Sequence, residues 1–264
     1  MLKVLLSLML VGSLGYGAKS AGQQPVAALP TFDVVVIKPN NSGSRRMSMD
    51  MDETAIRAEN ISLKTLMVNA YRIRDGLIAG LPGWADSARF DVTAKVSDPD
   101  MKALDKLSRE QRQAMLAALL ADRFHLKVHT ETKTLAVYEM VVAKGGAKLK
   151  TSVIPPPGPE NPDPLGYGDL DVHGTEISAT AVTLSDLAMN LSFPVDRTVI
   201  DKTGLTGRYD FQLRWTRDGV VAGEADAPPD LFTAIQEQLG LKLQAAKGPV
   251  ETLVVDHVER PAGN

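Results

Sequence analysis

The apolar positions of the chain recur in two blocks of about ninety residues. Residues 56–66 and 177–187 share the same spacing of apolar side chains at an offset of 121 positions. The offset falls to 119 between residues 89–92 and 208–211, and it reaches 113 in the last apolar block. Because loops accept deletions more readily than packed elements, the shrinking offset predicts one structural plan that occurs twice.

Within each copy, alternating stretches predict strands and stretches with helical spacing predict helices. Ser62 and Thr183 stand where helix N-caps are expected. Each copy is predicted to contain a hairpin, a helix, a strand, a helix and two closing strands. The closing strands are residues 125–131 with 137–143, and 241–244 with 250–258. Antiparallel strands with helices on one face predict an α+β fold of two related units.

The first twenty residues have the layout of a secretory signal peptide. Lys3 precedes the apolar run Val4–Leu14, and small residues follow up to Ser20. The run is too short for a membrane span. We therefore expect cleavage after Ser20, export to the periplasm or the extracellular space, and no membrane span in the mature chain. An uncleaved anchor is the alternative.

The remaining boundaries follow from composition. Residues 21–30 are predicted as a flexible leader, residues 31–150 as the first unit and residues 169–264 as the second. Residues 151–168 between them are rich in proline, which excludes a helix or a central strand and predicts an extended linker.

Composition is that of an ordinary globular protein, and it narrows the possible partners. The 264 residues are 44% hydrophobic and 23% charged, with a formal net charge of −3, so nothing indicates binding to nucleic acid. The chain contains no cysteine, which excludes disulfides and a lipid-modified cysteine. Stability must therefore come from the core.

The residues His129 and Glu131 are the nearest approach to a metal site. On a strand they share one face, about 7 Å apart, whereas His125 lies too far from His129 to bind the same ion. Two ligands do not form a site, and a solvated polar strand face is the favoured interpretation of the pattern. We therefore expect no cofactor.

Both copies contain the motif Arg-aromatic-Asp. On a strand its arginine and aspartate point to one face while the aromatic side chain enters the core. One interpretation is an exposed ion pair in each copy. The other is a polar ligand contact, with Trp84 as an apolar platform beside the first motif. The candidate binding residues are Trp84, Arg89, Asp91, Arg208 and Asp210.

No motif of a known catalytic class is present. The sequence lacks a cysteine nucleophile, the His-Glu-x-x-His pattern of zinc hydrolases and the Ser-x-x-Lys pattern of penicillin-recognising enzymes. Enzyme activity is therefore unsupported, although it is not excluded.

Several motifs are similar to those of the soil-associated protein family, a domain of unknown function abundant in acidobacteria. They are residues 120–131, 137–144, 148–150, 199–211 and 254–261. The resemblance implies no catalytic residues, because that family has none assigned. Some relatives carry a similar domain behind a membrane metallopeptidase region like that of the β-lactam sensors, which implies a sensory or binding role outside the membrane.

The sequence leaves three functional hypotheses. The first is an exported, sensor-like module that binds a small ligand or an envelope protein, in the groove between the units or on a strand edge. The second is a hydrolase acting on an envelope or extracellular polymer, with His129, Glu131, Asp91 or Asp210 as acid–base groups. The third is a structural envelope component.

Overall fold

The computed structural model confirms the predicted α+β class. It describes residues 29–52, 54–96, 100, 104, 107, 109–153, 168–217 and 228–261. The predicted signal peptide, most of the predicted leader and most of the proline-rich linker lie outside the described residues. None of the helices in these ranges is long and apolar enough to cross a membrane.

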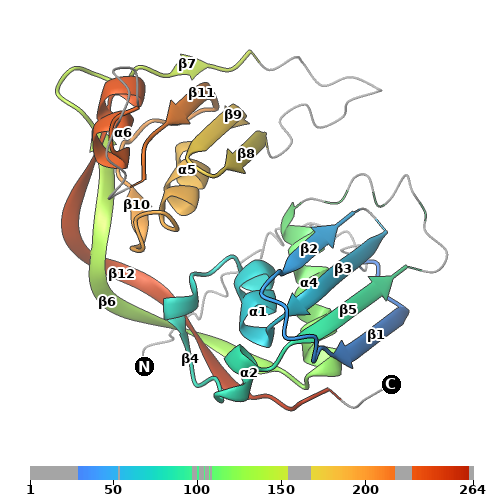
Figure 1. Cartoon of the computed structure of the whole chain (residues 1–264). Helices are drawn as coiled ribbons and strands as arrows, with labels where there is room; N and C mark the ends of the chain where they lie inside the picture. The colour runs from blue at the N-terminus through green and yellow to red at the C-terminus, as the bar shows by residue number, and fades with distance from the viewer. Residues whose placement is uncertain are drawn as a thin grey trace, which may run out of the picture.

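The first unit is an antiparallel sheet covered by helices on one face (Figure 1). Its strand order is β1 (Val34–Pro39), β5 (Phe90–Lys95), β3 (Ala55–Ile61) and β2 (Ser48–Met51). The helices are α1 (Leu63–Tyr71), the short α2 (Trp84–Ser87) and α4 (Arg109–Arg123). The turn η1 (Asp75–Leu77) and the two-residue strand β4 (Ile78–Ala79) follow α1.

The second unit repeats this plan. Its sheet has the order β7 (Lys150–Thr151), β11 (Tyr209–Arg214), β9 (Glu176–Val182) and β8 (Asp169–His173). Helices α5 (Leu184–Leu191) and α6 (Leu231–Leu239) pack against it. The hairpin, helix, strand and helix predicted for each copy are all present.

The predicted caps of α1 and α5 are confirmed. The Ser62 hydroxyl accepts a hydrogen bond from the backbone N–H of Thr65 at 3.1 Å. The Thr183 hydroxyl accepts one from the backbone N–H of Asp186, also at 3.1 Å. Each side chain satisfies one of the amide groups that a helix start leaves without an intrahelical partner.

The closing strands differ from the prediction. In each copy they form one continuous strand, β6 (Lys127–Val142) and β12 (Leu241–His257), and the two strands pair antiparallel along nearly their whole length. The apolar pattern breaks in the middle of β6 because residues 129–134 are solvent-exposed, not because the chain turns there. This two-stranded ribbon runs along the left side of the molecule in Figure 1 and joins the two units.

Through this ribbon, each copy contributes part of a strand to the unit formed by the other copy. The end of β12 contributes Leu253 and Val255 to the core of the first unit, and the end of β6 contributes Met140 to the core of the second. The two outer strands of the sheet that contains this ribbon are also arranged alike in the two copies. Strand β10 (Val199–Asp201) pairs parallel with β6, and β4 pairs parallel with β12. Each unit is therefore completed by a strand from the other copy.

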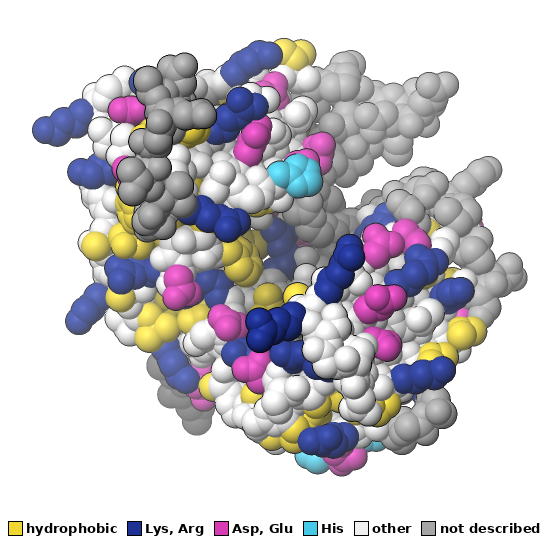
Figure 2. Space-filling model, viewed as in Figure 1, with side chains coloured by type: hydrophobic (Ala, Val, Ile, Leu, Met, Phe, Trp, Pro, Cys, Tyr) yellow, Lys and Arg dark blue, Asp and Glu magenta, His cyan; other side chains and the backbone are white. Residues whose placement is uncertain are grey.

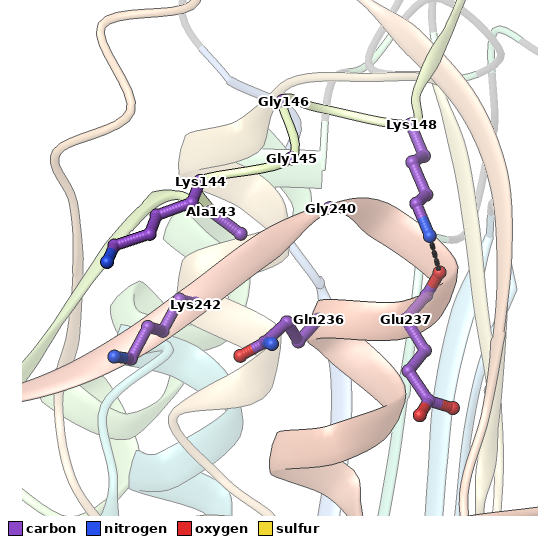
Figure 3. A pocket seen from close by; sticks show the side chains of 9 residues that line it. All are labelled: Ala143, Lys144, Gly145, Gly146, Lys148, Gln236, Glu237, Gly240 and Lys242. Carbon is purple, nitrogen blue, oxygen red and sulfur yellow. Dashed lines mark hydrogen bonds between the residues drawn. The ribbon is translucent and has the colours of Figure 1, made fainter.

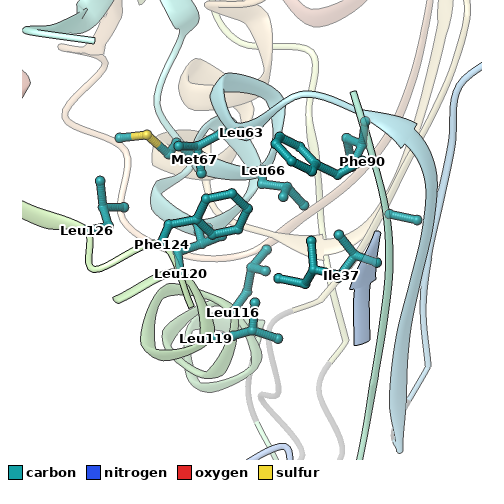
Figure 4. Packing of buried hydrophobic residues seen from close by; sticks show 14 of the residues in the cluster. Ile37, Leu63, Leu66, Met67, Phe90, Leu116, Leu119, Leu120, Phe124 and Leu126 are labelled. Atoms are coloured by element: carbon teal, nitrogen blue, oxygen red, sulfur yellow. The ribbon is translucent and has the colours of Figure 1, made fainter. Parts of the chain in front are cut away.

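The core of the first unit shows how this packing works. The rings of Phe90 and Phe124 meet edge to face, with centroids 5.6 Å apart. Phe124 is fully buried and lies beside Leu66 of α1 and Leu120 of α4 (Figure 4). Because α4 leads directly into β6, this core fixes where the ribbon begins.

Candidate functional site

In the first Arg-aromatic-Asp motif, the aspartate supports the backbone of a neighbouring strand. Asp91 accepts hydrogen bonds from the backbone N–H of Asn60 at 2.9 Å and from the side-chain amide of Asn40 at 2.7 Å. Asn60 lies at a bulge of β3 and has left-handed backbone angles, with φ 55°. Arg89 donates to the carbonyl of Asp86. Asp91 therefore holds an irregular strand in place.

The second motif does the same at the corresponding position. Asp210 accepts a hydrogen bond from the backbone N–H of Ala181 at 3.0 Å and another from the Ser152 hydroxyl. Ala181 also has φ 55° and lies 121 positions after Asn60. Arg208 donates to the Ala181 carbonyl at 2.8 Å. The hydrogen bond from Ser152, followed by that from Ala181, lowers the pKa of Asp210.

Trp84 lies at the start of α2, partly buried against the core of the first unit. The guanidinium carbon of Arg260 lies 5.3 Å from the centroid of its ring, as in a cation–π contact. The roles of Trp84 and of the two Arg-aromatic-Asp motifs as ligand contacts stay predictions.

The residues His129 and Glu131 share one face of β6, as expected, and a third group joins them. His129 Nδ1 lies 2.9 Å from Asp256 Oδ1, and its Nε2 lies 3.5 Å from Glu131 Oε1. Glu131 also pairs with Lys133 at 3.0 Å. The hydrogen bond with Asp256 raises the pKa of His129, and that with Lys133 lowers the pKa of Glu131.

The sequence did not indicate Asp256, because it reaches His129 only through pairing of β6 with β12 and a register shift near residue 256. In the described part of the chain, no group of three or more His, Cys, Asp or Glu side chains is arranged to hold a metal ion. His129, Glu131 and Asp256 form an ion-paired cluster on the exposed surface.

The four groups named for a hydrolase lie in three different sheets. Asp91 belongs to β5, Asp210 to β11, and His129 and Glu131 to β6. Both aspartates already accept hydrogen bonds from the backbone. These four described residues do not form one acid–base site.

A pocket that sequence reasoning missed lies in the second unit. It has a volume of about 780 Å³, and four aromatic side chains line it: Tyr138, Phe193, Trp215 and Phe232. We call it the aromatic pocket. Tyr138 comes from β6, Phe193 follows α5, Trp215 follows β11, and Phe232 belongs to α6. These residues are far apart in sequence, which is why no local motif indicated them.

The aromatic pocket combines a buried floor with an exposed rim. On the floor, Trp215 is 6% exposed and Ile177 is 1% exposed. On the rim, Val172, Phe193 and Phe232 are 47%, 46% and 42% exposed. Large apolar side chains at a pocket mouth leave surface that a bound ligand could cover.

Two contacts hold Tyr138 in the wall of the aromatic pocket. Its ring meets that of Phe232 edge to face, with centroids 5.3 Å apart. The guanidinium carbon of Arg197 lies 4.6 Å from the Tyr138 ring centroid. The wall is therefore formed before a ligand binds.

The aromatic pocket is not a consequence of the repeated plan. At the offset of 121, Phe193 corresponds to Arg72, and at the offset of 113, Tyr138 corresponds to Glu251. The first unit thus carries charged residues at these two positions. At these two positions the second unit therefore has aromatic side chains that the shared fold does not require.

A second depression, the inter-unit groove, lies between the two units. It has a volume of about 680 Å³ and is lined from both, for example by Tyr71, Arg74, Met189 and Phe193. Arg74 Nη1 lies 2.9 Å from Asp196 Oδ1, so an ion pair links the units. Figure 2 shows hydrophobic and basic side chains meeting in the depression between the upper and lower halves. Phe193 lines both cavities.

A smaller cavity of about 330 Å³ surrounds the end of α6 (Figure 3). Lys148 donates from its amine to the carbonyl of Glu237 at 2.7 Å, which satisfies a carbonyl at the helix end. Lys144 and Lys242 extend away from Lys148. The cavity lacks aromatic side chains, and its polar contact serves to cap the helix.

Comparison with known proteins gives a family and no function. Residues 64–258 match the model of a family described as protein of unknown function, DUF3738. No curated protein and no solved structure matches the chain.

Proposed function

This chain belongs to the protein family of unknown function DUF3738, and we propose that it is a ligand-binding module that recognises a small apolar ligand in the aromatic pocket. The observation that carries the proposal is the pocket itself, with its buried floor and exposed aromatic rim. Its volume lies in the range of roughly 300–1,000 Å³ typical of small-molecule sites, which are mostly lined by apolar and aromatic side chains.

The distribution of exposed apolar residues supports this site. Seven large hydrophobic side chains in the described ranges are exposed. Val172, Phe193 and Phe232 line the aromatic pocket, and Met189 lines the adjoining inter-unit groove. Scattered exposed apolar residues need no explanation, but gathered ones favour a binding surface.

We further propose that the mature protein acts outside the cytoplasm as a sensor-like module. The signal-peptide pattern of residues 1–20 supports export. The resemblance to proteins that carry a similar domain behind a membrane metallopeptidase region supports a sensory role. The hydrolase alternative lacks support, because its four candidate groups are spread over three sheets, with only His129 and Glu131 side by side.

The test is a thermal-shift screen of the protein from Ala21 onward against small apolar and aromatic compounds. A ligand that binds only the native state adds about 2.7 kcal/mol at a hundred times its dissociation constant. We expect hits whose effect is lost in Phe232→Ala. The control is Met47→Ala, which also removes an exposed apolar side chain but lies outside the pocket. Hits that survive in Phe232→Ala would contradict the proposal.

A further inference from the structure

The charges around the aromatic pocket do not cancel one another. Two nearby carboxylates each have an arginine partner, and a third lies beside a histidine. The pairs are Asp196 with Arg74 at 2.9 Å, Glu176 with Arg214 at 2.8 Å, and Asp171 with His173 at 2.9 Å. The two arginines therefore oppose the charges of Asp196 and Glu176, whereas His173 opposes that of Asp171 only when its ring is protonated.

A fourth carboxylate, Asp230, is occupied by the start of α6. One oxygen accepts from the backbone N–H groups of Phe232 at 2.9 Å and Thr233 at 3.1 Å, and the other from the Thr233 hydroxyl at 2.6 Å. These bonds, that from the Thr233 hydroxyl first, lower the pKa of Asp230. The helix N-terminus therefore balances this charge.

Two arginines beside the pocket have no such partner among the residues that the structure describes. Arg217 lines the pocket and is exposed, and no carboxylate among the described residues pairs with it. Arg197 lies against the Tyr138 ring, and it too has no carboxylate partner in the described ranges. An apolar pocket thus has two guanidinium groups beside it that no carboxylate in the described part of the chain pairs with.

We propose that the ligand of the aromatic pocket is an amphipathic anion, with an apolar or aromatic body and a carboxylate or sulfonate group bound by Arg217 and Arg197. This proposal rests on the proposed function, because it assumes that the pocket binds a ligand. The body replaces water against Trp215 and Phe232. The planar guanidinium group suits a carboxylate or sulfonate, since it donates two parallel hydrogen bonds.

The test compares two fluorescent probes with the same aromatic body, anilinonaphthalenesulfonate and the neutral phenylnaphthylamine. A hydrogen bond to a charged group contributes about 1.5–3 kcal/mol, equivalent to about tenfold or more in affinity. We expect the anionic probe to bind about tenfold more tightly, and Arg217→Gln to remove most of that difference without weakening the neutral probe. Arg197→Gln should weaken the anionic probe more than the neutral one, because it also removes a contact that holds Tyr138. Arg45→Gln is the control, since it makes the same charge change on an exposed residue of the first unit.

The outcomes separate this inference from the proposed function. If both probes bind equally, lose affinity in Phe232→Ala and are unaffected by Arg217→Gln, the pocket binds apolar ligands but the preference for anions is wrong. If neither probe binds, or if Phe232→Ala changes nothing, the proposed function itself fails. Added salt should weaken only the anionic probe, because screening acts on charges.

Discussion

At the scale of single residues, Asp91 and Asp210 serve the backbone. Each accepts a hydrogen bond from the amide of a residue with left-handed angles, Asn60 in β3 and Ala181 in β9. A left-handed conformation costs an ordinary L-residue roughly 1–2 kcal/mol. The residue type differs between the copies, but both have a left-handed residue at the corresponding position and an aspartate that accepts its amide hydrogen bond. This shared role accounts for the aspartate of the motif in both copies.

We predict that Asp91→Ala lowers the free energy of unfolding by about 1–3 kcal/mol, because it leaves the buried amide of Asn60 without its acceptor. Asp50→Ala is the matched control, since Asp50 is 76% exposed and has only a 3.8 Å ion pair with Arg57. Urea denaturation measures the free energy of unfolding of both variants. Equal losses in the two variants would contradict the role assigned to Asp91.

His129 gives a prediction about pH. Because Asp256 and Glu131 raise its pKa in the folded protein above the ordinary value of 6.5, protonated His129 stabilises the native state. The contribution is fully present below the unfolded pKa and is lost as pH rises through the raised folded pKa. His129→Gln should therefore lower the melting temperature near pH 5 and have little effect near pH 9. A pH-independent difference would show that the ion pairs contribute nothing.

The sequence indicated the two Arg-aromatic-Asp motifs but not their partners. Ala181 is not a residue type that favours left-handed angles, so the bulge it occupies could not be expected from its identity. Asp256 meets His129 only across the ribbon, and the register of that pairing is not visible in either strand alone.

At the scale of elements, helix α6 ends where the chain must pass close to another segment. Gly240 has φ 64°, and a Cβ there would lie 2.1 Å from the carbonyl oxygen of Gly146. Glycine is required at this position both for its backbone angles and for the close approach.

We predict that Gly240→Ala destabilises the protein clearly more than Gly174→Ala. Gly174 has a similar φ of 59°, but a Cβ there would meet no atom within 4 Å. Both changes carry the left-handed cost of roughly 1–2 kcal/mol, and only Gly240→Ala adds the clash with Gly146. Thermal unfolding of both variants gives the comparison. Equal shifts would mean that the contact between residues 146 and 240 is not as tight as described.

The elements show what local pattern can and cannot predict. Apolar periodicity and capping residues predicted the hairpins, α1, α5 and α6, because these features depend on neighbours in sequence. The same reasoning divided β6 and β12 into shorter strands, because their exposed middle resembles a turn. The pairing of β6 with β12 joins segments that are far apart in sequence, and local apolar periodicity does not predict such pairing.

At the scale of the whole molecule, strand exchange makes the two units depend on each other. Leu253 of β12 is buried in the first unit, and Met140 of β6 is buried in the second. The aromatic pocket depends on the same exchange, because Tyr138 reaches it on β6. The sequence analysis assigned each copy to its own unit, so it could not predict that Tyr138 of the first copy lines a pocket of the second unit.

We predict that Leu253→Ala and Met140→Ala each lower the stability of both units, by about 2–5 kcal/mol, in one cooperative transition. The fluorescence of the two tryptophans follows the unfolding of each unit separately, since Trp84 packs in the first unit and Trp215 in the second. Trp84→Phe and Trp215→Phe backgrounds leave one reporter each. If Leu253→Ala shifts only the unfolding reported by Trp215, the exchange of strands is wrong.

The most direct test of ligand binding in the aromatic pocket uses the fluorescence of Trp215, which lines that pocket. In a Trp84→Phe variant, Trp215 is the only tryptophan, because the chain has two. We predict that adding anilinonaphthalenesulfonate quenches Trp215 emission in a saturable way, through energy transfer to the probe, and that Phe232→Ala weakens this binding. If the probe leaves Trp215 emission unchanged while quenching Trp84 in a Trp215→Phe variant, ligands bind elsewhere and the aromatic pocket is not the recognition site.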